Sequence, residues 1–103
     1  MAILLRTLPE VTVATPGTRV ALYTSNLMVY CVSVQSLPSN TGTHYIGDST
    51  VSSSNGVTFA AGDVAEIDGP PGIRGGQEQF DLSTIYVDAT VGGTKFRITA
   101  WTR

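Results

Sequence analysis

The run Gly47-Asp48-Ser49 is the part of this sequence that comes closest to a catalytic serine. A nucleophilic serine needs a histidine as its general base and an acid that orients that histidine. His44 is the only histidine in the chain, and it precedes Ser49 with no histidine after it. We therefore predict that the protein is not an enzyme and has no catalytic residues, and that His44 is a surface or turn side chain.

Carboxylates provide the other candidate chemistry. Four of them lie on different predicted strands and turns rather than in the dense pattern of a calcium loop: Asp48, Asp63, Glu66 and Asp68. With one histidine and one cysteine, a transition-metal site within one chain is not expected, although an ion shared on a symmetry axis stays open. Asp63 and Glu66 could lie about 5–10 Å apart, as glycosidase carboxylates do. However, a chain of 103 residues with one tryptophan offers little groove for a sugar substrate. We predict no metal and no cofactor.

Trp101 is the aromatic residue whose position suggests a binding role. It lies on the polar face of the last predicted strand. An exposed tryptophan is more often an edge or interface anchor than a site of chemistry. A small carbohydrate-binding module, in which Trp101 and a tyrosine would act as stacking platforms, is therefore one alternative function.

The composition indicates one domain with an unusually neutral surface. The chain has 103 residues, which suits a single domain. Charged residues make up 14% of it, below the roughly 25% that is typical of soluble domains. Such a surface suits a protein that packs against partners. The formal net charge is −2, and the sequence has no basic stripe of the kind that nucleic-acid binding requires. We predict no nucleic-acid partner.

The cysteine content and the first residues bear on the compartment. Cys31 is the only cysteine, so no disulfide can form within the chain. We interpret Cys31 as a small buried apolar residue, with an intermolecular bridge or a reactive thiol as the alternative. The apolar run in residues 1–6 is too short for a signal peptide or a membrane span. We therefore expect no membrane partner, and synthesis in a cytoplasm-like compartment before any assembly.

The spacing of apolar residues and turns predicts an all-β fold. Residues 1–10 form an N-terminal arm or a first strand, and residues 11–103 form a single β-sandwich domain. The most clearly patterned predicted strand, residues 28–35, is apolar on both faces in its first half, which favours a central position. Residues 94–103 alternate, with Phe96, Ile98 and Ala100 facing inward. About eight short antiparallel strands, with a turn every 8–12 residues or so, indicate a jelly-roll-like β-sandwich.

Residues 40–63 contain the densest set of turn signals in the chain. Asn40-Thr41-Gly42 predicts a turn, and Tyr45-Ile46 favours a strand. Asn55-Gly56 predicts a type I′ hairpin turn, because that turn needs positive φ at both central residues. Val57 and Phe59 then continue at strand spacing, and Gly62-Asp63 closes the unit with another turn. Gly92-Gly93 predicts a second two-residue hairpin turn later in the chain.

The same stretch resembles small virion structural proteins of tailed bacteriophages. The residues that carry the resemblance are Asn40-Thr41-Gly42, Tyr45-Ile46-Gly47-Asp48, Val51-Ser52, Asn55-Gly56-Val57 and Gly62-Asp63. In that group, a segment of the form NTG-x-x-Y-(I/V)-G-D-S-x-V-(S)-x-x-N-G-(I/V) precedes a short strand and a glycine-containing turn. The Gly/Pro-rich residues 69–77 have no counterpart in the pattern.

The resemblance implies a structural role in a phage particle. A capsid cement or decoration protein would bind the major capsid protein on the virion surface and would form a homo-oligomer, for which we expect a trimer. A tail, head–tail junction or fibre component is the alternative position. We expect partner contacts at Ile3, Leu4 and Leu5 of the arm, at Ile73 and Arg74 in the 69–77 loop, and at Trp101. These six residues are chosen for their apolar or flexible character outside the predicted core, not for the resemblance.

Overall fold

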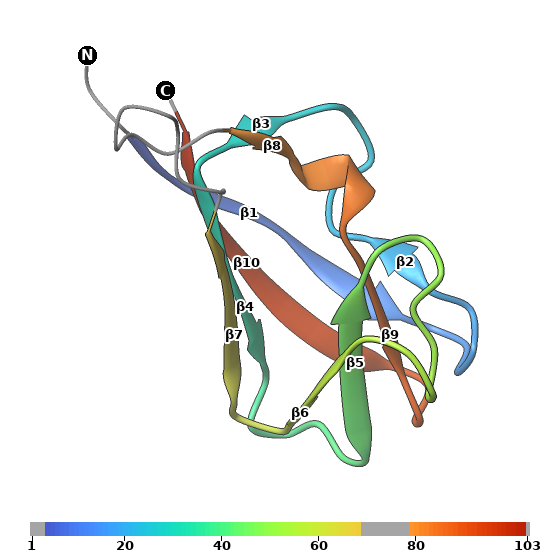
Figure 1. Cartoon of the computed structure of the whole chain (residues 1–103). Helices are drawn as coiled ribbons and strands as arrows, with labels where there is room; N and C mark the ends of the chain where they lie inside the picture. Colours follow the sequence, from blue (N-terminus) through green and yellow to red (C-terminus); the bar gives the residue numbers. More distant parts are fainter. Residues whose placement is uncertain (1–3, 69–78, 103) are drawn as a thin grey trace.

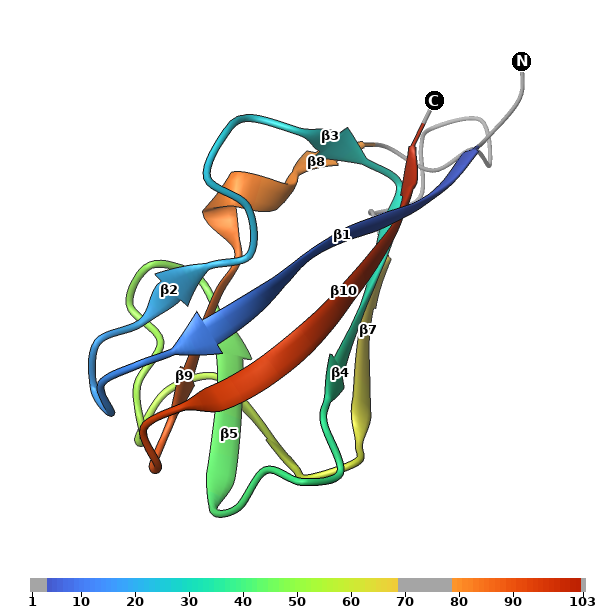
Figure 2. The same ribbon diagram turned by 180° about the vertical axis from the view of Figure 1, so that it is seen from behind.

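Two antiparallel sheets pack face to face and form the body of the protein (Figures 1 and 2). The computed structural model describes residues 4–68 and 79–102. Three of the predicted contact residues, Ile3, Ile73 and Arg74, lie outside the described residues, as does the loop 69–77. Sheet A contains, in spatial order, β1 (Leu4–Val13), β10 (Thr94–Thr102), β4 (Cys31–Ser36) and β7 (Val64–Asp68). Sheet B contains β2 (Val20–Ala21), β9 (Tyr86–Ala89), β5 (Thr43–Gly47) and β6 (Val57–Ala60). The predicted all-β sandwich is confirmed.

The strands pair in a nested order. The first strand lies beside the last, β1 with β10, and the next pairs inward are β2 with β9, β4 with β7 and β5 with β6. This nested pairing brings the two ends of the chain together in one sheet of the sandwich. A short extra ribbon of β3 (Met28–Val29) and β8 (Phe80–Asp81) covers one end, followed by a 3₁₀ turn, η1 (Leu82–Thr84). Asp81 caps that turn by accepting a hydrogen bond from the Ser83 N–H.

The core lies between the two sheets and follows the alternation of the sequence. On β10, Phe96, Ile98 and Ala100 are buried as predicted, and they pack with Val32 and Val34 of β4. Sheet B contributes a smaller set of buried residues: Ile46, Val87 and Ala89. Each fully buried aliphatic or aromatic side chain stabilises the fold by about 1.5–3 kcal/mol relative to exposure. The inward face of β10 is therefore a main source of stability.

A β-bulge in β1 explains how a strand containing proline stays in sheet A. The register shifts between Leu8, opposite Ile98, and Val11, opposite Phe96. Pro9 lies in this irregular step, where no ladder hydrogen bond from its nitrogen is needed. The extra residue also lets both Leu8 and Val11 face the core.

The predicted strand at residues 28–35 is interrupted at Tyr30. Val29 is fully buried and Met28 is 47% exposed, because β3 turns away to pair with β8. Beyond the interruption, Val32 and Val34 face the core, and β4 lies between β10 and β7. The central position is confirmed for β4, whereas a single continuous strand is wrong.

Two turn predictions are corrected by the structure. The hairpin of β5 and β6 is confirmed, but Asn55 does not have positive φ, so Asn55-Gly56 is not a type I′ turn. Residues 48–56 instead form a loop. The buried side chain of Val51 packs against Gly47 and Gly56, where the loop begins and ends. Gly92-Gly93 does not close a hairpin between paired strands, because β9 belongs to sheet B and β10 to sheet A.

Replacing Gly56 by alanine is expected to destabilise the fold by about 3 kcal/mol. Gly56 has a φ of +112°, and a Cβ there would lie 2.7 Å from Val51 Cγ2 and 2.8 Å from the Ile46 carbonyl oxygen. Gly62 is the matched control, since its φ is +83° but nothing lies within 4 Å of its Cβ position. We expect Gly62→Ala to cost only about 1 kcal/mol. Urea unfolding of both variants tests this, and equal losses would contradict it.

Candidate functional site

His44 is a core residue rather than a surface or turn side chain, so that prediction is wrong. Its side chain is fully buried on β5. The imidazole makes edge-on contacts with the rings of Phe59 and Phe96, with centroids 5.6 and 5.5 Å away. His44 and Ile46 are two residues apart on β5, so both side chains face inward. The same spacing to the apolar Ile46 was the signal in the sequence that His44 is buried.

The imidazole of His44 is hydrogen-bonded at both nitrogens. Nε2 donates to the Thr41 carbonyl oxygen at 3.3 Å, which leaves Nδ1 to accept from the Ser36 hydroxyl at 2.9 Å. A serine hydroxyl beside a histidine is the geometry of a nucleophile and its base. However, both side chains have no exposed surface. This pair therefore satisfies buried polar groups and offers no access to a substrate.

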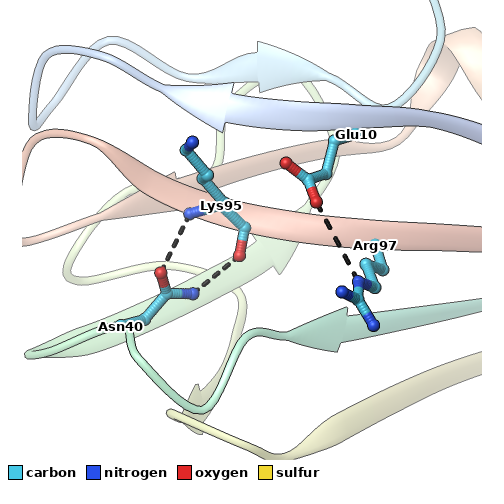
Figure 3. A network of polar contacts seen from close by, with 4 residues as sticks. All are labelled: Glu10, Asn40, Lys95 and Arg97. Atoms are coloured by element: carbon cyan, nitrogen blue, oxygen red, sulfur yellow. Dashed lines mark hydrogen bonds and ion pairs between the residues drawn. The ribbon is translucent and has the colours of Figure 1, made fainter.

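Asn40 extends this network to sheet A (Figure 3). Its side-chain oxygen accepts from the Lys95 N–H at 3.1 Å, and its side-chain nitrogen donates to the Lys95 carbonyl oxygen at 2.6 Å. The same nitrogen also donates to the Ser36 hydroxyl at 2.9 Å. Asn40 thus fastens the turn after β4 to the backbone of β10. Its role is structural.

The other motif residues also stabilise the backbone. Asp48 accepts hydrogen bonds from the Thr50 hydroxyl and N–H, which lower the pKa of its carboxyl below the usual range. Val51 is buried against Gly47 and Gly56. Asp63 accepts from the Ala60 N–H at 3.0 Å. The polar residues that define the sequence pattern of residues 40–63 therefore stabilise the backbone of this segment.

The outer face of sheet A carries a shallow hollow of about 710 Å³. Trp101 lies at its end, opposite Leu5 of β1 on one side and Cys31 of β4 on the other. The structure thus brings together two residues predicted as partner contacts, Leu5 and Trp101. Leu4 is the next residue along β1, and both leucines are more than half exposed, at 54% and 62%.

Apart from the apolar residues Leu8, Val64 and Ile98 and the charged pair of Glu10 and Arg97, the rest of the hollow is lined by neutral polar side chains. Four of them have no side-chain hydrogen-bond partner among the described residues: Thr7, Ser33, Gln35 and Thr99. At the edge, Arg97 Nε lies 3.9 Å from Glu10 Oε2, and both side chains are largely exposed (Figure 3). From the sequence, Arg97, Thr99 and Trp101 were predicted to face outward from the last strand. The alternation along β4 and β10 indicated in the sequence which polar residues face outward. No sequence pattern indicated that these two strands lie side by side.

Cys31 is half-buried on this outer face rather than fully buried in the core. Burial raises the pKa of its thiol, and the hydrogen bond and charge of Asp68 add to the effect, followed by the charge of Glu66. Together they raise the pKa to about 12. The thiol is therefore protonated at neutral pH. A reactive cysteine would need the opposite environment, one with positive charge nearby.

Comparisons with known proteins add no family to this geometry. A scan of protein-family models and searches of curated proteins and of solved structures found no match to the chain. Within residues 4–68 and 79–102, no group of three or more His, Cys, Asp or Glu side chains is arranged so that it could hold a metal ion. No helix in the same residues has the length and apolar character to cross a membrane.

Cys31 is expected to react at least about a hundredfold more slowly with a thiol reagent at pH 8 than a free cysteine does, because only the thiolate attacks. Asp68→Asn removes the acceptor and the negative charge, so it should lower the pKa of the thiol and speed the reaction. Chromogenic disulfide exchange, with the unfolded chain as reference, measures both rates. A folded protein that reacts as fast as the unfolded chain would contradict the prediction.

Proposed function

We propose that this chain is a structural protein of a tailed-bacteriophage particle, namely a capsid cement or decoration protein that binds the outer shell and bridges capsid subunits. The observation that carries the proposal is that sheet A has exposed apolar surface at both of its edges. A bridging protein needs two adhesive surfaces that face different neighbours. The resemblance of residues 40–63 to phage virion proteins supports the same role.

The first adhesive surface is the start of β1. Leu4 and Leu5 are exposed there, and among the described strands this part of β1 bonds only to β10. An exposed sheet edge with large apolar side chains tends to associate with another chain. Figure 2 shows this end of β1 at a corner of the molecule away from sheet B. A partner can therefore approach it without obstruction by the other sheet.

The second adhesive surface is an apolar opening along β7, the opposite edge of sheet A. The opening measures about 510 Å³ and is lined mainly by five apolar residues: Ile46, Val57, Ala65, Ile67 and Ile85. Val57, which lines the opening, is 65% exposed. The charged residues that line the opening are both acids, Asp48 and Glu66. Sheet B therefore leaves the inner face of β7 partly uncovered.

Shell stabilisation would follow from binding alone. A protein that binds the assembled shell and not the separated subunits stabilises the assembly by about 2.7 kcal/mol per site at a hundred times its Kd. Two unlike surfaces on one chain also permit head-to-tail association, which closes into a ring when the rotation fits. A ring of three copies is the homotrimer that we expect. Arg6 beside the leucines is complementary in charge to the acidic rim of the opening.

The position in the particle is tested by counting copies of the chain against the major capsid protein in purified particles with quantitative mass spectrometry. We expect hundreds of copies in simple ratio to the capsid subunit. A few to a few dozen copies would instead place the chain in the tail, the head–tail junction or a fibre. Absence of the chain from particles would overturn the proposal.

Leu4→Ser is expected to weaken binding to particles that lack the protein by about tenfold, because an apolar anchor is lost from the contact. Val91→Ser is the matched control, since Val91 is also exposed, at 39%, but lies in the turn between β9 and β10. Co-sedimentation with depleted particles measures both affinities. Undiminished binding of the Leu4 variant would exclude the start of β1 from the contact.

A further inference from the structure

The hollow on the outer face of sheet A shares Leu5 with the proposed shell contacts, but its polar lining takes no part in them. It lies over β1, β10 and β4 and reaches Val64 at the start of β7. Trp101 is half-buried at one end, so the hollow has an indole surface beside a groove that runs across the strands. Side chains of this size on a concave surface can hold a small ring-shaped group. The size and shape of the hollow suit a ligand rather than a large flat interface.

The hydrogen-bonding groups of the hollow are neutral and unpaired. Thr7, Ser33 and Thr99 present hydroxyls, and Gln35 presents an amide. Each of these groups can both donate and accept, and none has a side-chain partner among the described residues. A protein surface that covered the hollow would have to satisfy all four groups, since an unsatisfied buried polar group is costly. A ligand rich in hydroxyls would satisfy them directly.

The charges around the hollow indicate a neutral ligand. Arg97 and Glu10 lie 3.9 Å apart and offset one another. Among the described residues, no further cation lines the hollow to attract a phosphate or sulfate group, and no further acid lines it to attract a cation. This lining therefore suits an uncharged ligand that has many hydroxyls and one apolar face. Sugar rings have this combination.

We propose that the hollow binds a neutral oligosaccharide. One pyranose ring stacks its apolar face on Trp101, and the hydroxyls of the chain exchange hydrogen bonds with Thr99, Ser33 and Gln35. The site goes beyond the proposed structural role and does not depend on it. A particle protein with this site would attach to a glycan while its sheet edges hold the shell.

The test uses the fluorescence of the isolated full chain. Trp101 is the only tryptophan, so its emission reports on this site alone. We titrate the protein with a panel of neutral gluco-, galacto-, manno- and N-acetylglucosamine oligosaccharides and expect a saturable change with at least one of them. Gln35→Ala should raise the Kd by about tenfold, as expected for one lost hydrogen bond. Thr12→Ala, an exposed position on β1 outside the hollow, should leave the Kd unchanged.

Two results would overturn the proposal. One is the absence of a saturable change with every sugar in the panel. The other is a response that is equally strong in the Gln35→Ala and wild-type proteins. Trp101→Ala, followed by calorimetry and checked for folding by circular dichroism, should abolish sugar binding. Loss of particle binding without any sugar response would show that the hollow is a protein contact. The shell proposal would survive that result.

Discussion

The buried contact between His44 and Phe96 joins the two sheets, and the loops around it depend on this contact. His44 belongs to sheet B and Phe96 to sheet A, and both have no exposed surface. Because both imidazole nitrogens are hydrogen-bonded, the ring can occupy an apolar site without leaving a polar group unsatisfied. Ser36 and Asn40 then carry the network to the backbone of β10. One polar chain thus fixes the spacing of the sheets at this end.

This constraint separates the residues that make the fold from those available for binding. The polar residues of the 40–63 stretch bond to the backbone or to the buried network, so the motif that suggests a phage protein is architectural. The surfaces left for partners are the two edges of sheet A and the hollow between them. A β-sandwich supports many unrelated functions, so the fold alone does not assign one.

The sequence predicted the elements whose burial follows a simple alternation. Phe96, Ile98 and Ala100 were placed correctly, because every second residue of β10 faces the core. Prediction failed where one residue was judged by its type instead of its phase, as with His44. It also failed where a neighbouring strand changes the path of the chain. Val29 turns inward because β3 pairs with β8, and that pairing joins residues about fifty positions apart in the sequence.

By itself, the sequence determined the all-β fold class, since that class depends on local patterns of alternation and on turn residues. Only the tertiary structure decided which outward side chains lie together. Leu5, Trp101 and Cys31 come from three separate strands and become neighbours through the register of sheet A. The order of strands depends on the packing of the whole chain, so no local pattern could reveal the hollow or the two edges that flank it.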